Sequence, residues 1–195
     1  MIKRVFDVVV SSAALAVSAP LMALIALAIK STSEGPIIFT QERVGRRGKP
    51  FRIFKFRTMR INDGPAVSTT TDPRITRVGR LLRASKLDEL PQFANVVRGE
   101  MSLVGPRPEV REYVEKWPDE LRPVILSVRP GITDPASIQF RNEAEILASV
   151  DDPETHYVET ILPQKAAAYA EYVRTRSFTG DLAIIARTAK AVAVG

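Results

Sequence analysis

The sequence contains no cysteine and a single histidine, His156. Without cysteine, the chain can form neither a disulfide framework nor a thiolate-built metal site, and one imidazole alone is no ligand set for a transition metal. Acidic residues are also in the minority, because 22 Asp and Glu stand against 28 Lys and Arg. The resulting net charge of +6 and pI near 9.8 predict an anionic partner: nucleic acid, a phosphorylated substrate or the acidic face of a membrane.

Charge is missing altogether from one long stretch near the N-terminus. Residues 8–29 are uncharged and rich in Ala, Val and Leu, between Asp7 and Lys30. As one helix they would be about 33 Å long, enough to span a hydrocarbon core of about 30 Å. The chain of 195 residues is 45% apolar, which also suffices for an ordinary folded core. The sequence therefore predicts one domain plus a membrane element.

The membrane element is predicted to turn back rather than to cross. Pro20 lies near its middle, where it removes a helical hydrogen bond, bends the helix and leaves two arms of about 18 Å, each too short to cross alone. Both flanks are basic, so the positive-inside rule places both in the cytoplasm. We therefore expect a re-entrant helix-break-helix over residues 1–34, with Ser18 and Pro20 at the break, and a compact cytosolic domain over residues 35–195.

Two other interpretations of this N-terminal segment stay open. One is a helix that crosses the membrane once and is kinked at Pro20. The other is a secretory signal, although the small residues 16–19 lead straight into Pro20, which makes a poor cleavage site.

Basic residues dominate the segment that follows. Between Arg43 and Arg60 there are eight basic residues and no acidic one. Lys55 and Arg57 alternate with phenylalanines, which predicts that they lie near the core, whereas the others are expected on a solvated or membrane-facing surface. No signature of an RNA- or DNA-binding fold is present, so we expect no nucleic-acid partner. Further along, two or three residues of a basic row can converge on one phosphate: Arg74, Arg77, Arg80, Arg83 and Lys86.

Two adjacent carboxylates, Asp88 and Glu89, carry the clearest chemical signal. Proline is tolerated in a first helical turn, so Pro91 predicts a helix that begins near Leu87 or Asp88. One interpretation is structural: Asp88 caps the helix and Glu89 complements its dipole. The other is functional, because such a pair can hold Mg²⁺ and a phosphate, and one carboxylate can attack phosphorus as a nucleophile.

Two Pro-rich loops follow, at residues 105–108 and 129–133. Each holds one arginine, Arg107 or Arg129, between residues of few conformations, which lowers the entropy lost on binding a phosphate. Plain turn formation explains the loops equally well.

The remaining patterns predict a mostly α fold with a small β element. Tyr113, Trp117 and the last helix are expected either in a membrane interface, as amphipathic elements, or in the core. Short strands are expected at residues 36–39 and 51–56, and helices at residues 121–126, 162–172 and 181–194.

Six stretches resemble, in order, the bacterial sugar transferase family, the monotopic phosphoglycosyl transferases that start glycoconjugate assembly. They are KRVFD (3–7), FTQERVG (39–45), FRIFKFRTM (51–59), DPRITRVG (72–79), LDELPQ (87–92) and MSLVGPRP (101–108). The chain resembles the minimal catalytic unit of that family.

The resemblance implies a Mg²⁺-dependent enzyme on the cytoplasmic face of the bacterial inner membrane, with a re-entrant helix. Asp88 would attack the β-phosphorus of a UDP-sugar, and polyprenyl (undecaprenyl) phosphate would then take the phospho-sugar from the aspartyl intermediate. Glu89 would bind Mg²⁺ or assist proton transfer, and both carboxylates are candidate metal ligands. The candidate phosphate-binding residues are Arg83, Arg107, Lys55, Arg57, Arg129 and Arg141.

The chain departs from the family pattern at two places. Ala19-Pro20 replaces the common Ser-Pro pair, with Ser18 adjacent, and residues 134–137 replace a frequent Gly-Trp-Ala-Gln stretch. If the loop at residues 134–137 contacts the sugar, sugar identity cannot be copied from better-known members of the family. The sequence also leaves a homodimer open. Two other function classes also stay open: a Mg²⁺-dependent lipid phosphatase or nucleotidase, and a basic membrane- or nucleic-acid-binding protein without catalysis.

Overall fold

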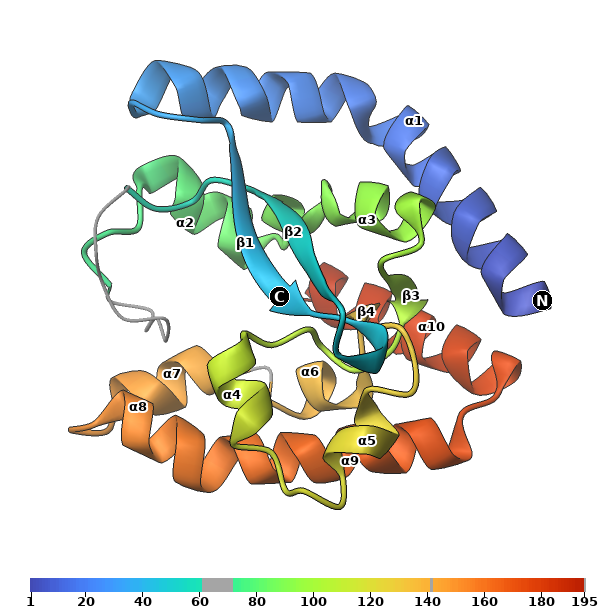
Figure 1. Ribbon diagram of the computed structural model, residues 1–195. Helices are drawn as coiled ribbons and strands as arrows, with labels where there is room; N and C mark the ends of the chain where they lie inside the picture. The colour runs from blue at the N-terminus through green and yellow to red at the C-terminus, as the bar shows by residue number, and fades with distance from the viewer. Residues whose placement is uncertain (61–71, 141, 195) are drawn as a thin grey trace.

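The computed structural model describes residues 1–60, 72–140 and 142–194, with side chains up to residue 191. These residues are mostly helical and carry two small sheets, which confirms the predicted fold class at this level (Figure 1). The strands are β1 (Ile38–Val44), β2 (Pro50–Phe56), β3 (Ser102–Val104) and β4 (Gly131–Thr133). The helices are α1 (Ile2–Thr32), α2 (Arg77–Ala84), α3 (Gln92–Arg98), α4 (Arg111–Glu115), α5 (Arg122–Ile125), α6 (Pro135–Gln139), α7 (Glu143–Ala148), α8 (Pro153–His156), α9 (Leu162–Thr175) and α10 (Phe178–Val194).

Helix α1 is continuous through Pro20, and Figure 1 shows that it is bent into two arms. The Ser18 hydroxyl donates to the Ala14 carbonyl at 2.6 Å, a bond back along the helix that favours bending. The bend therefore combines Pro20, which frees the Ala16 carbonyl, with a Ser18 hydroxyl that bonds the carbonyl one turn before it. The re-entrant topology itself stays a prediction.

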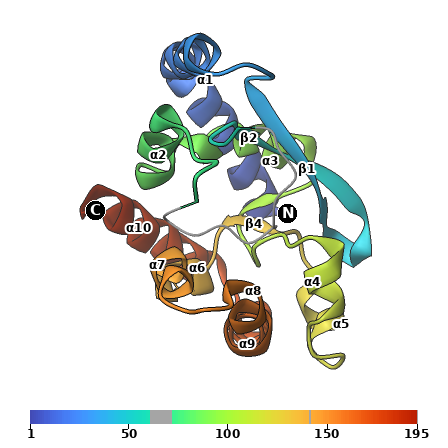
Figure 2. The same cartoon turned by 90° about the vertical axis from the view of Figure 1, so that its left-hand side faces the viewer.

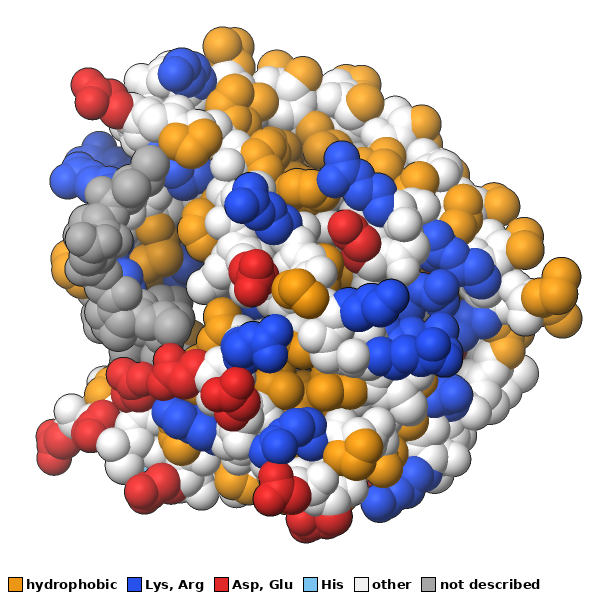
Figure 3. Space-filling model, viewed as in Figure 1, with side chains coloured by type: hydrophobic (Ala, Val, Ile, Leu, Met, Phe, Trp, Pro, Cys, Tyr) orange, Lys and Arg blue, Asp and Glu red, His pale blue; other side chains and the backbone are white. Residues whose placement is uncertain are grey.

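Most of the outer surface of α1 is apolar and exposed. Val9, Val17, Leu24 and Leu27 are among its exposed side chains, and apolar atoms cover the upper edge of the molecule in Figure 3. Among the described residues, α1 is the one helix whose length and composition suffice to cross a membrane. An exposed apolar surface of this extent marks a contact with another protein or with a membrane, and a helix of this length is suited to lipid.

The antiparallel hairpin β1–β2 joins α1 to the rest of the fold. Its register runs from Ile38 opposite Phe56 to Val44 opposite Pro50. The second strand is close to the predicted 51–56, whereas the first continues to Val44, beyond the predicted 36–39. Ile53 packs into the cluster on α3, whereas Phe56 packs into the cluster on α1. Figure 2 shows the hairpin between α1 at one end of the molecule and α8–α9 at the other.

Strands β3 and β4 form a short parallel pair that brings the two Pro-rich loops together. Ser102 pairs with Gly131, and Val104 with Thr133. The strands continue into a close backbone contact, since a Cβ atom on Gly131 would lie 2.1 Å from the Gly105 nitrogen. Only glycine allows this approach, which fixes the backbone beside Arg107.

The largest buried cluster lies among α4, α5 and α9. Trp117 is 3% exposed and Tyr113 is 4% exposed, and both belong to this cluster with Tyr157 and Tyr169. These two side chains are therefore core residues, and the alternative that they lie in a membrane interface is wrong. The predicted helices at residues 121–126, 162–172 and 181–194 are confirmed as α5, α9 and α10.

Candidate functional site

Asp88 and Glu89 lie in a tight turn that leads into α3. Lys86 adopts a left-handed conformation with φ 57°, a 3₁₀ turn follows at Leu87–Glu89, and α3 begins at Gln92 after Pro91. The helical turn thus begins at the predicted place, but Pro91 occupies the cap position of α3 and no side chain caps that helix. The structural interpretation of Asp88 as an N-cap is therefore wrong.

Glu89 is held by two cations from different parts of the fold. Its Oε1 accepts from Lys55 Nζ on β2 and from Arg107 Nη2 after β3, both at 2.7 Å. Burial alone would raise the pKa of Glu89, but Arg107 and Lys55 together hold it well below its usual range. Glu89 therefore remains an anion that orders two cations.

Asp88 has the opposite environment. It is 7% exposed, and its Oδ1 has no hydrogen-bond partner within the described part of the chain. Burial raises its pKa, although the charge of Lys55 opposes this shift. A buried carboxylate oxygen without a partner is costly, and such an atom points to a ligand or a reacting group.

Arg83 completes the group of cations around Asp88. Helix α2 packs tightly on the end of the hairpin, because a Cβ atom on Gly79 would lie 1.9 Å from the Thr58 carbonyl oxygen. Arg83, one turn later, donates from Nε to Thr58 Oγ1 at 3.0 Å, and its charge lowers the pKa of Asp88. No role for Thr58 is predicted from the sequence, although Thr58 lies within one of the six stretches that resemble the family.

Two other predicted phosphate ligands bind backbone carbonyls elsewhere. Arg57 donates to the Ser33 carbonyl at 2.9 Å and to the Glu34 carbonyl, at the C-terminal end of α1. Arg129 donates to the Gly99 carbonyl at 2.8 Å, just after α3. A phosphate-binding role for either stays a prediction, and Arg141 lies outside the described residues.

The basic residues from Arg74 to Lys86, three of which lie on α2, differ in their surroundings, as their helical spacing predicts. Arg83 lies close enough to Asp88 for its charge to lower the pKa of that carboxyl, whereas Arg77, Arg80 and Lys86 are exposed. Arg74 forms an ion pair with Asp72 at 2.6 Å. Two members of the row, Arg83 and Lys86, thus lower the pKa of Asp88 by their charge, and their convergence on one phosphate stays a prediction.

The site fits Mg²⁺ through Asp88 rather than through a cluster of acids. Within residues 1–60, 72–140 and 142–194, no group of three or more His, Cys, Asp or Glu side chains can hold a metal ion. Mg²⁺, however, commonly binds one or two carboxylates and completes its shell with water and substrate phosphates. The partnerless Asp88 Oδ1 suits that arrangement, whereas Glu89 is already engaged by Lys55 and Arg107.

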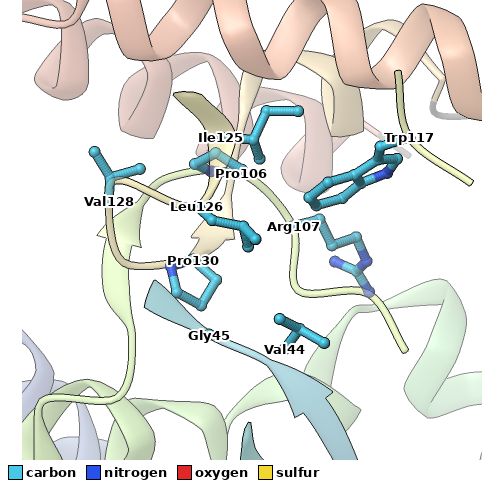
Figure 4. A pocket seen from close by; sticks show the side chains of 9 residues that line it. All are labelled: Val44, Gly45, Pro106, Arg107, Trp117, Ile125, Leu126, Val128 and Pro130. Atoms are coloured by element: carbon cyan, nitrogen blue, oxygen red, sulfur yellow. The ribbon is translucent and has the colours of Figure 1, made fainter. Parts of the chain in front are cut away.

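A small pocket lies beside Arg107, and residues of the two Pro-rich loops form part of its lining (Figure 4). Its lining is mainly apolar, and Arg107 is its one cation. Lys55, Arg83, Asp88 and Glu89 do not line it, so this pocket is not the space between the carboxylates and their cations. The lining residues are Val44, Gly45, Pro106, Arg107, Trp117, Ile125, Leu126, Val128 and Pro130.

Known proteins are similar to this chain over much or all of its length. The model of the family described as bacterial sugar transferase matches residues 1–195. A UDP-glucose:undecaprenyl-phosphate glucose-1-phosphate transferase of Caulobacter vibrioides is 42% identical over 95% of this chain and 67% of its own length. A transferase of the same name from Escherichia coli is 37% identical over 95% of this chain and 39% of its own length.

A third relative is named for a different sugar. The putative undecaprenyl-phosphate N-acetylgalactosaminyl 1-phosphate transferase of Bacillus subtilis is 43% identical over 62% of this chain and 69% of its own length. The chain thus spans from 39% to 69% of the length of these three curated relatives. The family match and the relatives confirm the resemblance carried by the six stretches: the chain belongs to the bacterial sugar transferase family.

Proposed function

We propose that this protein transfers a sugar 1-phosphate from a UDP-sugar to polyprenyl phosphate and releases UMP. The observation that carries the proposal is the pairing of two unlike carboxylates: Asp88, buried with a partnerless oxygen, beside Glu89, held by Lys55 and Arg107. The relatives supply the acceptor class, because their names specify undecaprenyl phosphate. The reaction would be the first membrane step in building a glycoconjugate.

The proposed reaction has two displacements at one phosphorus atom. An Asp88 oxygen attacks the β-phosphorus of the UDP-sugar, the bond from that phosphorus to the UMP oxygen breaks, and UMP leaves. A phosphate oxygen of the polyprenyl phosphate then attacks the same phosphorus and releases the Asp88 carboxylate. Splitting a difficult transfer in this way is the usual benefit of a covalent intermediate.

The cations around the pair would bind the phosphates and stabilise the charge that develops on them. Arg83 lies beside Asp88, and Lys55 and Arg107 meet at Glu89, so donors surround the reacting position on several sides. Arg107 can also offer two parallel donors to a phosphate. Mg²⁺ bound at Asp88 would neutralise part of the diphosphate charge.

The other enzyme class transfers the same phosphoryl group to water. Both a lipid phosphatase and a nucleotidase need a positioned water instead of a lipid acceptor. A nucleotidase would release UMP from the UDP-sugar without polyprenyl phosphate, whereas a lipid phosphatase would release inorganic phosphate from the lipid and no UMP. A non-catalytic basic protein would explain the charge and the apolar helix but not the buried Asp88 oxygen without a partner. Transfer is therefore the function that the site supports best.

UMP release against a panel of UDP-sugars tests this function. The relatives named for glucose and N-acetylgalactosamine make UDP-glucose and UDP-N-acetylgalactosamine the first two donors. We expect continuous UMP release only with polyprenyl phosphate present, and at most one equivalent per enzyme without it. Continuous release without the lipid would instead indicate hydrolysis and contradict the transferase.

The charge distribution suits a protein seated on the cytoplasmic face of a membrane. In Figure 3 apolar atoms follow α1, whereas acidic side chains gather over α7 and α8, away from that helix. Arg57 holds the end of α1 against the hairpin. We propose that α1 enters the bilayer and returns by the same face, with the remaining chain in the cytoplasm.

Single cysteines in this cysteine-free chain test that topology. Ile2→Cys and Glu34→Cys lie beyond the two ends of the apolar run. In intact cells, both are expected to resist an impermeant reagent added from the periplasm, and both should react after the membrane is permeabilised. Pro20→Leu is expected to straighten the helix and to expose position 2 in part of the molecules. Periplasmic labelling of Ile2→Cys with Pro20 in place would show that the helix crosses.

A further inference from the structure

The first two turns of α1 are bonded to strand β3 by polar side chains. Asp7 Oδ2 accepts from the Ser102 hydroxyl at 2.7 Å, and its Oδ1 accepts from the Leu103 N–H at 3.4 Å. Asp7 is 3% exposed, and no ion pair links it to a described cation. Breaking the hydrogen bonds of a buried carboxylate has a large free-energy cost, so these two contacts constrain the position of β3.

The end of the same strand is bonded by α1 again and by one further helix, α9. The Val104 carbonyl accepts from Lys3 Nζ on α1 and from the Tyr172 hydroxyl on α9, both at 3.2 Å. Asp181, on α10, joins these two donors: it accepts from Lys3 at 2.6 Å and from Tyr172 at 2.7 Å. β3 is thus fixed by side chains at both of its ends.

The link from β3 to the site is short and stiff. Only Gly105 and Pro106 separate Val104 from Arg107. Gly105 packs against the second Pro-rich loop, and the Pro106 carbonyl accepts from the Gly131 N–H at 2.9 Å. Proline also fixes its own φ angle, so a displacement of β3 passes directly to Arg107.

On the basis of the proposed function, we infer that Asp7 is a positioning residue, which acts through β3 to hold Arg107 beside Glu89. Asp7 lies on the helix that is proposed to enter the membrane. The same contact therefore links the position of α1 in the membrane to the geometry of the phosphate-binding cations. A purely structural role is the alternative, in which Asp7 attaches α1 to the domain and affects Arg107 no more than any other group.

A double-mutant cycle with Arg107 separates the two roles. Asp7→Asn and Ser102→Ala each weaken the contact while Arg107 is kept, and each is expected to lower kcat about tenfold, as a misplaced catalytic group does. In an Arg107→Ala background the same changes should cost less than about twofold, because the group they position is gone. Ser11→Ala is the matched control, since Ser11 is buried on the same helix and its hydroxyl has no partner among the described residues.

Two outcomes would overturn the inference. Equal losses from Asp7→Asn in both backgrounds would show that Asp7 serves as an anchor only. Hydrogen exchange of the segment 102–107 gives a second readout that needs no turnover: we expect faster exchange in Asp7→Asn and Ser102→Ala but not in Ser11→Ala. Unchanged exchange would refute the contact to β3. If exchange behaves as expected while the unmodified protein transfers no sugar phosphate, the proposed function fails instead.

Discussion

Asp88→Asn is expected to reduce turnover to the background of the assay while the protein still folds and binds membranes. A neutral amide is a poor nucleophile for phosphorus and a weak ligand for Mg²⁺, so both proposed roles of Asp88 disappear together. UMP release and trapping of a phospho-sugar adduct measure the loss. Neither signal should remain in protein purified from cells without the unmodified gene.

The same variant should not be less stable than the unmodified protein. Burial raises the pKa of Asp88, which means that the folded state disfavours its charged form. Above that raised pKa, the charge therefore lowers the free energy of unfolding, and a neutral Asn removes this cost. A melting temperature that is equal or higher, together with lost turnover, identifies a group kept for chemistry. Near-normal turnover in Asp88→Asn would rule out the covalent mechanism.

The local sequence patterns locate the carboxylate pair but not the partners of Glu89. Pro91 predicts a helical turn around Asp88, and this prediction depends on neighbours a few residues away. The ion pairs of Glu89 join it to Lys55, 34 residues earlier, and to Arg107, 18 residues later. Such contacts depend on how strands and helices pack, so the role expected for Glu89, Mg²⁺ binding or proton transfer, did not include ordering two cations.

Lys55 and Arg57 have different partners, although the sequence pattern predicts similar positions for both. Both alternate with phenylalanines, and in an unbroken strand both would point to the same side. Strand β2 ends at Phe56, however, and Arg57 turns to the carbonyl groups that follow α1. The sequence predicts two similar cations near the core. In the folded chain Lys55 binds Glu89 in the carboxylate turn, whereas Arg57 binds the end of α1.

Arg107→Ala is expected to lower kcat about 100-fold, or about 3 kcal/mol, as the loss of one strong electrostatic stabiliser does. Arg107 Nη2 bonds Glu89 Oε1 at 2.7 Å, and in its absence Lys55 remains the single described cation bonded to Glu89. Arg107→Lys should recover only part of the activity, because an ammonium group lacks the planar, two-pronged geometry of a guanidinium.

Two further measurements distinguish the loss of Arg107 from the loss of any positive charge. Arg46→Ala removes an exposed charge whose Nε bonds the Ser127 carbonyl, so it controls for the loss of one positive charge from the basic segment, and it should change kcat less than about twofold. If Arg107 binds a phosphate in both displacements, Arg107→Ala should also slow the first one, which is measured as the single equivalent of UMP released without lipid. Full activity of Arg107→Ala would mean that its loop only shapes the backbone. In that case the cations that meet at Glu89 would serve the fold, and Arg83 alone would remain to hold phosphate beside Asp88.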